Sequence, residues 1–127
     1  MDDESAVLAA NDAFYVAFAT GDIEAMGRLW ADRPQVSCVH PGWAPLFGRA
    51  EVMASWRAVL AKPPAVTVDE ARVALHGTAA VVLCRERIGK ASLSASNVLV
   101  RTADGWKIVH HQSGPMAPQE QTALVLH

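Results

Sequence analysis

The sequence is poor in charge, and it has neither a basic run nor a hydrophobic run of membrane-spanning length. Only 19% of its 127 residues are charged, the net charge is −2, and no two Lys or Arg residues are adjacent. This argues against nucleic acid and anionic membranes as partners, and no apolar run approaches the ~20 residues of a transmembrane helix. The N-terminus MDDESA lacks the pattern of an export signal, so we expect a cytoplasmic protein.

Cysteine is equally scarce, with two residues in the chain. Cys38 and Cys84 both lie in apolar, strand-like segments, and we interpret them as buried reduced thiols rather than as a disulfide. Neither takes part in a CxxC pair or a Cys/His finger spacing, which argues against a structural zinc site. A two-histidine, one-carboxylate metal site of His40, His110 and Glu86 is a weaker alternative, because these residues are far apart in the sequence. We therefore expect no metal and no cofactor.

What the sequence does contain is an ordinary globular composition, with 51% hydrophobic residues. A chain of 127 residues fits one domain and can bury a core without disulfides or metals. We assign a single domain to residues 1–127, with its core at about 5–115, and leave the role of the tail at 115–127 open.

The first half of the chain shows the helical period. Apolar residues spaced by three and four predict a helix capped by Ser5 and broken at residues 20–22, a second at 23–30 and a third at 50–60. A short strand is predicted at 35–39, where His40-Pro41-Gly42 then forces a turn.

After residue 64 the hydrophobic period changes from 3.6 to 2. Four β-rich segments follow, separated by short turn sequences, at 66–75, 79–88, 92–101 and 106–113. Turns this short predict consecutive antiparallel hairpins. Three helices followed by such a meander predict an α+β domain, with the helices on one face of a curved antiparallel sheet.

Three stretches carry a family resemblance: ATGDIEAMGRLWADRPQVSCVHPGW, LFGRAEVMASWRAVL and ASNVLVRTADGWKIVHHQSGP. Their order over about residues 5–115 resembles the nuclear-transport-factor-2-like superfamily, and most of all its SnoaL-like, ketosteroid-isomerase-like branch. The resemblance implies a cone-shaped curved antiparallel sheet wrapped around three N-terminal helices, an α+β barrel of the cystatin-like type with one deep pocket. It implies little about activity, because the superfamily includes isomerases, cyclases, dehydratases, hydrolases and non-catalytic binding domains.

The resemblance also carries functional positions of the ketosteroid isomerases onto this sequence. The isomerase base, just before a proline, corresponds to His40, and the neutral acid, eight residues before the glycine of the last hairpin, corresponds to Asn97. The oxyanion tyrosine corresponds to Phe14, while Tyr15 lies about 100° around the helix. His40 can still act as a general base and Asn97 can donate to an oxyanion, but Phe14 has no hydrogen to donate.

The last strand, WKIVHHQSG, alternates between the two faces of the predicted sheet. In the resembling isomerases the position of His110 lines the pocket, so we expect His110 and Gln112 to face inward and His111 outward. Glu86 could also point inward, but its orientation is left open. The predicted pocket has polar groups at His40, Asn97, His110 and Gln112, surrounded by Phe14, Trp43, Leu46 and Trp56.

Each of these residues also has a purely structural interpretation. His40 can cap a strand end, Asn97 can satisfy a bulge in the curved sheet, and His110 can be a hydrogen-bonded core histidine. Trp56 is most simply a core residue. Trp43 follows a Pro-Gly turn on a loop and is the better candidate for a ligand contact.

Three functions therefore remain open. The first is a cofactor-free isomerase, dehydratase or hydratase acting on a small hydrophobic carbonyl compound, in which His40 moves a proton, Asn97 or Gln112 steadies the oxyanion, and His110 is a further catalytic candidate. The second is a module that binds a small apolar ligand without turnover. The third is a structural domain that only dimerises. Covalent catalysis is the least attractive, because no nucleophile stands beside a base.

A homodimer is expected from the outward face of the last two strands. With Asn97 inward, the residues facing outward are Ser96, Val98, Val100, Val109, His111 and Ser113. Such a face is too apolar to leave in water, and a second copy would cover it with two-fold symmetry. Resembling proteins dimerise in this way. His111 would then lie at the interface, where its protonation in acid could loosen the dimer.

Overall fold

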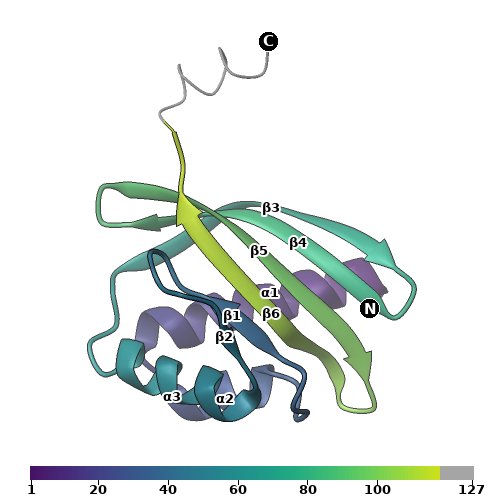
Figure 1. The fold of residues 1–127 in the computed structure, drawn as a ribbon. Coiled ribbons are helices and arrows are strands. Elements are labelled where there is room, and N and C mark those ends of the chain that lie inside the picture. Colours follow the sequence, from purple (N-terminus) through teal and green to yellow (C-terminus); the bar gives the residue numbers. More distant parts are fainter. Residues whose placement is uncertain (118–127) are drawn as a thin grey trace.

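The computed structural model describes residues 1–117, in which helices cover one face of a curved, open sheet (Figure 1). The tail at 118–127 lies outside the described residues. The elements in chain order are α1 (Asp3–Thr20), α2 (Ile23–Leu29), β1 (Ser37–Val39), β2 (Leu46–Phe47), α3 (Arg49–Leu60), β3 (Val66–His76), β4 (Ala79–Ile88), β5 (Ala91–Thr102) and β6 (Gly105–Pro115). The predicted α+β architecture is confirmed. The three helices precede the change of hydrophobic period near residue 64, and the four long strands follow it.

The sheet is mixed rather than wholly antiparallel. Its strand order is β2-β1-β6-β5-β4-β3, and the last four strands in sequence form the predicted antiparallel meander. β1 instead runs parallel to β6. The sequence gives no warning of this, because α3 and three long strands separate the two and no hairpin turn sets their relative direction. The two-residue strand β2, which was not predicted, pairs antiparallel with β1.

The boundaries of the first two helices follow ordinary capping chemistry. Asp2, not the predicted Ser5, caps α1, because its carboxylate accepts a 2.8 Å hydrogen bond from the Ser5 amide. Gly21 ends α1 with a left-handed φ of 69°, and a Cβ at this position would lie 3.0 Å from the Leu60 carbonyl oxygen. Asp22 then caps α2, because its carboxylate accepts a 3.0 Å hydrogen bond from the Ala25 amide. The glycine is therefore required both by the turn and by the close approach of α3.

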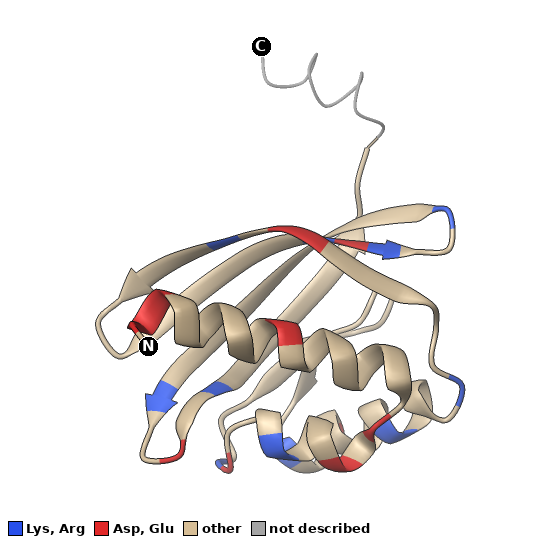
Figure 2. Cartoon of the chain, turned by 180° about the vertical axis from the view of Figure 1, so that it is seen from behind, with Lys and Arg blue, Asp and Glu red and all other residues tan. Residues whose placement is uncertain are grey.

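Acidic and basic residues are interspersed along the described chain (Figure 2). Asp3, in the first turn of α1, accepts hydrogen bonds from Arg101 at 3.1 Å and from the indole N–H of Trp106 at 3.3 Å. These bonds join the start of α1 to the β5–β6 hairpin. Within residues 1–117, none of the helices is both long and apolar enough to cross a bilayer.

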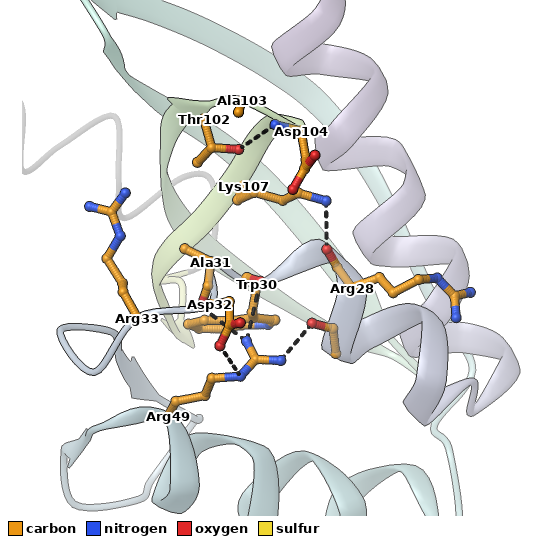
Figure 3. Close-up of a pocket in the computed structure, with 11 residues that line it drawn as sticks. Arg28, Trp30, Ala31, Asp32, Arg33, Arg49, Thr102, Ala103, Asp104 and Lys107 are labelled. Atoms are coloured by element: carbon orange, nitrogen blue, oxygen red, sulfur yellow. Dashed lines mark hydrogen bonds and ion pairs between the residues drawn. The ribbon is translucent and has the colours of Figure 1, made fainter.

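Arg49 ties the start of α3 to the end of α2. Its guanidinium donates hydrogen bonds of 2.8–3.2 Å to the carbonyl oxygens of Gly27, Trp30 and Ala31 (Figure 3). These carbonyls lie at the C-terminal end of α2 and just beyond it, where backbone oxygens lack partners within the helix. One charged side chain therefore replaces the missing helical hydrogen bonds and sets the spacing of the two helices.

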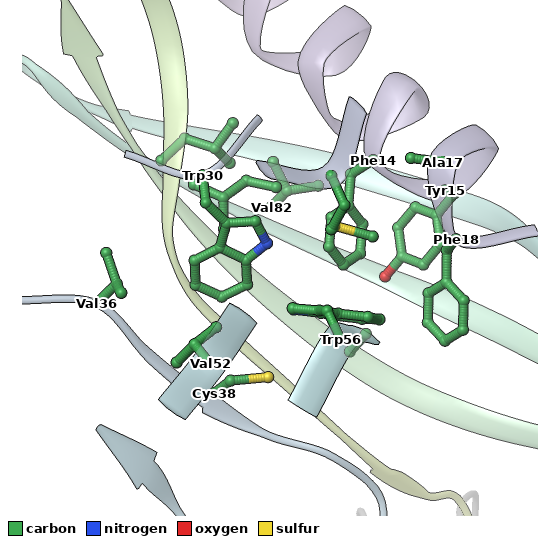
Figure 4. Close-up of a cluster of buried hydrophobic side chains, with 14 of the residues drawn as sticks. Phe14, Tyr15, Ala17, Phe18, Trp30, Val36, Cys38, Val52, Trp56 and Val82 are labelled. Atoms are coloured by element: carbon green, nitrogen blue, oxygen red, sulfur yellow. The ribbon is translucent and has the colours of Figure 1, made fainter. Parts of the chain in front are cut away.

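Aromatic side chains fill the space between the helices and the sheet. Phe14 and Phe18 of α1 meet Trp56 of α3 edge to face, with ring centroids 5.4 and 5.0 Å apart (Figure 4). Phe14 and Trp56 are fully buried. Two side chains predicted to line an open pocket are thus in contact with each other.

One extra residue in β6 interrupts the alternation of its side chains. Leu99 on β5 pairs with Ile108, but the preceding residue Val98 pairs with His110, so that Val109 has no partner of its own. A β-bulge of this kind places two residues of one strand opposite one of its neighbour and reverses the facing of every residue beyond it.

The bulge overturns the predicted facing of the end of β6. His111 and Ser113 are buried on the inner face, while Gln112 is exposed. His110 is half-buried on the outer face, where its Nδ1 lies 2.7 Å from the hydroxyl of Ser37. The prediction that His110 and Gln112 face inward and His111 outward is therefore wrong. Strict alternation was assumed, and the register shift broke it.

The outer face of the sheet is apolar, but its composition differs from the prediction. Val98 and Val100 face outward as expected, and Leu83 and Phe47 add side chains that are 57% and 67% exposed. His111 is inside the protein, so the predicted acid-sensitive interface at this residue is wrong.

We expect Arg49→Met to lower the free energy of unfolding by about 2–4 kcal/mol, because three carbonyl oxygens lose a charged donor. Arg33→Met is the matched control, since Arg33 is exposed nearby and its side chain makes no contact of this kind. That variant should change stability by no more than ~0.5 kcal/mol. Urea denaturation measures both, and equal effects would rule out the proposed role of Arg49.

Candidate functional site

A group of polar side chains is buried between α1 and the inner face of the sheet. Each is at most 7% exposed, although each carries hydrogen-bonding or ionisable atoms. We call this group the inner polar cluster, and its members are Asn11, Tyr15, Cys84, Glu86, Asn97, His111 and Ser113. Buried polar groups need partners, so the hydrogen bonds of the cluster decide what it can do.

Glu86 is at the centre of the cluster and is 1% exposed. The Tyr15 hydroxyl donates to its Oε2 at 2.7 Å, and the Ser113 hydroxyl donates to its Oε1 at 2.6 Å. The orientation of Glu86, which the sequence left open, is therefore inward. Both carboxyl oxygens accept a hydrogen bond from a neutral donor.

No Lys or Arg contacts Glu86 within residues 1–117. Its neighbours on β4, Arg85 and Arg87, point to the other face of the strand, where they bind Asp69 at 3.1 and 2.9 Å. Figure 2 shows these charges together on β3 and β4. Burial raises the pKa of Glu86, and the hydroxyls of Ser113 and Tyr15 offset only part of this effect. A buried carboxyl without a cation favours its protonated form.

His111 faces this carboxyl as a neutral imidazole. Its Nδ1 lies 2.6 Å from Oδ1 of Asn97, and its Nε2 lies 3.7 Å from Oε2 of Glu86. Burial, and to a smaller extent the nearby imidazoles of His40 and His110, lowers the pKa of His111 to about 3. The imidazole is therefore uncharged at neutral pH.

His40 lies at the end of β1 and is also buried. Its Nε2 is 2.9 Å from the Ser55 hydroxyl oxygen, and its ring packs against Trp56 and Trp43 with centroids 4.7 and 4.8 Å apart. Trp43 is 45% exposed, so it covers His40 from the solvent side. Burial lowers the pKa of His40 to about 4. The ring centroids of His40 and His111 are 6.4 Å apart.

Both cysteines are free and buried, as predicted. The sulfur of Cys38 lies 3.6 Å from Nε2 of His40, but burial raises the pKa of this thiol to about 12. The sulfur of Cys84 lies 3.4 Å from the Tyr15 oxygen, and burial raises its pKa too. A thiol with a raised pKa is a poor nucleophile at neutral pH.

The structure brings together only some of the predicted site residues. Asn97 and Glu86 belong to the inner polar cluster, and His40 lies beside Trp43 and Trp56. Phe14 is a core residue that contacts His111, and Leu46 is half-buried on β2 beside β1. His110 and Gln112 lie outside the cluster. The weaker metal alternative of His40, His110 and Glu86 is not assembled, and no other trio of possible metal ligands is present in residues 1–117.

Sequence reasoning missed several members of the cluster. Tyr15 lies around the helix from Phe14, yet both are buried, since α1 is covered by the sheet as well as by α2 and by Trp56 of α3. Asn11 lies four residues before Tyr15, and this spacing could have revealed both. The inward facing of His111 and Ser113 depends on the bulge and has no counterpart in the sequence.

Two hollows reach members of the cluster: Tyr15 lies on the wall of one of about 310 Å³ between α1 and β3, and Cys84 lies on the wall of one of about 430 Å³ formed by β4, β5 and β6. The hollow of about 660 Å³ in Figure 3 lies elsewhere, between α2, the start of α3 and the β5–β6 turn. Arg49 and Lys107 on its wall already bind backbone carbonyls. Because Glu86 itself is 1% exposed, a ligand that reaches this carboxyl must displace side chains.

The sequence profile of the SnoaL-like domain family matches residues 7–118. The chain belongs to this family, within the nuclear-transport-factor-2-like (NTF2-like) superfamily. No curated protein matches the SnoaL-like chain.

Several solved structures share the SnoaL-like fold. A protein from Streptomyces avermitilis, named as a candidate dehydratase of the NTF2-like family, is 35% identical, covers 91% of this chain and 97% of its own, and superposes with a TM-score of 0.83. A protein from Thiobacillus denitrificans, named as a candidate association domain of calcium/calmodulin-dependent protein kinase type II, is 33% identical, with coverages of 87% and 94% and a TM-score of 0.79. A protein with a cystatin-like fold from Caulobacter vibrioides is 15% identical, with coverages of 98% and 97% and a TM-score of 0.82, and shares the fold alone.

The buried imidazoles predict that acid destabilises this SnoaL-like domain. Because burial lowers the pKa of His40 to about 4 and that of His111 to about 3, the unfolded chain binds protons at a higher pH than the folded chain. Their contribution to stability is complete above the unfolded pKa of ~6.5 and is lost as the pH falls towards the folded values. The free energy of unfolding should fall by up to ~1.4 kcal/mol per pH unit for each imidazole.

Urea denaturation between neutral pH and pH 5 measures this slope, and His40→Gln and His111→Gln should each flatten it. Glu86 acts in the opposite sense, because its raised pKa stabilises the folded chain in acid and that contribution is lost as the pH rises. A double variant that keeps the wild-type slope would show that these imidazoles are not the source.

Proposed function

We propose that this SnoaL-like chain is a cofactor-free enzyme of the isomerase or lyase type, which moves a proton on a small uncharged carbonyl compound. Glu86 is the proton-carrying group in this proposal, and His40 is the second acid–base group. The observation that supports it is a carboxyl that is 1% exposed, bound by two hydroxyls and accompanied by no cation in the described chain.

A carboxyl is a costly choice for a purely structural position of this kind. Burying an ionised carboxylate without a cation is strongly unfavourable, and a glutamine would form hydrogen bonds with the same hydroxyls without a charge. Carboxyls whose pKa is raised by burial are typical of acid–base sites, because their pKa moves towards neutral pH. A role for its proton in acid–base catalysis would explain why a carboxyl, rather than an amide, occupies this buried position.

The arrangement suits a reaction with two proton carriers. Dehydration next to a carbonyl removes a proton from carbon and protonates the departing hydroxyl group. His111 lies near both carriers, because its Nε2 is 3.7 Å from the carboxyl of Glu86 and its ring centroid is 6.4 Å from that of His40. The resemblance to the Streptomyces avermitilis protein, named as a candidate dehydratase, supports this reaction class. We place the entrance at Trp43, the half-exposed side chain that covers His40.

The substrate in this proposal is neutral and largely apolar. The interior around the cluster is built of aromatic and aliphatic side chains and of two imidazoles that are uncharged at neutral pH. A charged substrate would lose its hydration there without gaining an opposite charge. Small hydrophobic ketones and enones are therefore the first compounds to test.

A second function is supported by the outer face of the sheet. The exposed Leu83 and Phe47 lie on this face, and the protein from Thiobacillus denitrificans is named as a candidate association domain. We propose that two copies of the chain cover this face with two-fold symmetry, which is the commonest form of oligomer. This dimer leaves the inner polar cluster free for catalysis, and the proposal of a dimer does not depend on the proposal of an enzyme.

Proton exchange in D2O tests the enzyme without knowledge of the natural substrate. We expect the protein to speed the exchange of α-protons in small cyclic ketones or enones, followed by proton NMR, and Glu86→Gln to slow it by about 10²–10⁴-fold. The same variant should keep or raise the melting temperature, because functional sites trade stability for activity. Glu51→Gln, at an exposed position of α3, is the control.

Two outcomes would refute catalysis by Glu86. The first is that no compound in the series exchanges faster with protein than with buffer. The second is that Glu86→Gln exchanges as fast as the wild type. A third variant, His40→Gln, should also slow exchange if His40 carries the second proton.

Light scattering at micromolar concentration tests the dimer, whose mass should be twice the 13.6 kDa of one chain. Leu83→Asp should give monomers, because it places a charge in the buried centre of the interface. Leu75→Asp, at an exposed leucine of β3 whose strand partner Ala80 faces the interior, should leave the dimer intact. A monomeric wild type would disprove the dimer, and a dimeric Leu83→Asp variant would disprove this face.

A further inference from the structure

We infer that Asn97 and Ser55 are positioning residues that hold His111 and His40 in opposite neutral tautomers. Nε2 of His111 and Nδ1 of His40 are then the two nitrogens without a hydrogen. The inference rests on the proposed function for its chemical use, but the tautomers themselves follow from counting hydrogens in the buried network.

The tautomer of His40 follows from the single hydrogen of the Ser55 hydroxyl. Ser55 donates this hydrogen to the carbonyl oxygen of Val52, at 2.7 Å, within α3. The serine oxygen also lies 2.9 Å from Nε2 of His40, and it has no second hydrogen to give. Nε2 must therefore carry the hydrogen and donate it to Ser55. In the neutral imidazole this leaves Nδ1 bare.

The tautomer of His111 follows from the single hydrogen of the Tyr15 hydroxyl. Tyr15 donates it to Glu86 at 2.7 Å, so the tyrosine oxygen can only accept from Nδ2 of Asn97, at 3.3 Å. The other amide hydrogen of Asn97 goes to Oδ1 of Asn11, at 2.8 Å. The amide of Asn97 is thereby oriented, with its oxygen towards His111.

The oxygen of Asn97 lies 2.6 Å from Nδ1 of His111, which must donate to it. Nε2 of His111 is then bare, and it faces Oε2 of Glu86 at 3.7 Å. The two histidines thus present different nitrogens as acceptors, although they have the same chemical nature. Ser55 for His40 and Asn97 for His111 each fix the hydrogen on one ring nitrogen, and the other nitrogen is then free to accept a hydrogen bond.

This arrangement gives protonated Glu86 an acceptor. Its two oxygens already accept from Ser113 and Tyr15, so a proton on the carboxyl needs a lone pair to point at. The bare Nε2 of His111 offers this lone pair, and because it lies 3.7 Å from Oε2, the two groups must approach each other before they form a hydrogen bond. If the proton moves across, the O–H bond of Glu86 breaks and an N–H bond forms on His111, leaving a carboxylate beside an imidazolium. The opposite tautomer would aim an N–H at Glu86, offer its proton no acceptor and favour the ionised form of the carboxyl.

Asn97 does not have the predicted role of a hydrogen-bond donor to a substrate oxyanion. Both of its amide hydrogens are used by Asn11 and Tyr15, and none is left for a substrate oxygen. Asn97 acts through His111 by setting its tautomer. In this cluster an oxyanion donor would have to come from a group whose hydrogen can be redirected, such as the Tyr15 hydroxyl.

NMR of the imidazole nitrogens tests the inference on the full chain labelled with ¹⁵N and without any substrate. Correlation of the ring carbons' hydrogens with both ring nitrogens separates the two neutral tautomers. At neutral pH we expect the hydrogen on Nε2 of His40 and on Nδ1 of His111. The same tautomer in both rings, or a hydrogen on Nε2 of His111, would overturn the assignment.

Variants of Ser55 separate positioning from packing. Ser55→Ala should remove the constraint on His40 and give a mixture of its tautomers, whereas Ser55→Thr, which keeps the hydroxyl, should restore the Nε2–H form. Ser37→Ala is the matched control, because it removes a hydroxyl that contacts a histidine outside the cluster, at 2.7 Å from His110. That variant should leave the signals of His40 and His111 unmoved.

The two proposals fail separately. If the tautomers are as assigned but Glu86→Gln exchanges α-protons as fast as the wild type, the enzyme is wrong and the positioning stands. If exchange depends on Glu86 but Ser55→Ala leaves His40 in one tautomer, the enzyme stands and the role of Ser55 is wrong.

Discussion

The 2.6 Å hydrogen bond between His111 and Asn97 joins the two central strands of the sheet on its buried face. Through Asn97 it continues to Asn11 and Tyr15 on α1, so one connected network links the helix to the sheet. The bond exists only because a bulge in β6 turns His111 inward, opposite Asn97. The inner polar cluster, the neutrality of its imidazole and the environment of Glu86 all depend on it.

The network is stable because it is neutral and nearly complete. Low dielectric strengthens each hydrogen bond but makes an unpaired polar group costly. Both imidazoles avoid this cost by remaining unprotonated, and Glu86 reduces it by favouring its protonated form. The price is a domain that is sensitive to acid through its histidines, and a carboxyl that is held away from its ordinary pKa.

The closed interior and the apolar outer face support different uses of the same scaffold. A SnoaL-like domain can be an enzyme through its interior or an association module through its sheet, and similar structures are named as candidates for each. In this chain the aromatic side chains of α1 and α3 fill the space beside the cluster. The proposed catalysis therefore needs a motion that admits the substrate, and Trp43 is the half-exposed side chain that packs on His40.

The sequence by itself determined the helices, the four-stranded meander and the family, because hydrophobic period, turn residues and caps are local signals. The family resemblance carried by the sequence also placed His40 and Asn97 inside, and the helical period placed Trp56 there. Only the tertiary structure decided that β1 pairs parallel with β6 and that His111, rather than His110, faces the interior. Both depend on register between strands, and a shift of one residue moves a side chain from one face to the other without changing the hydrophobic pattern from which the strand was predicted.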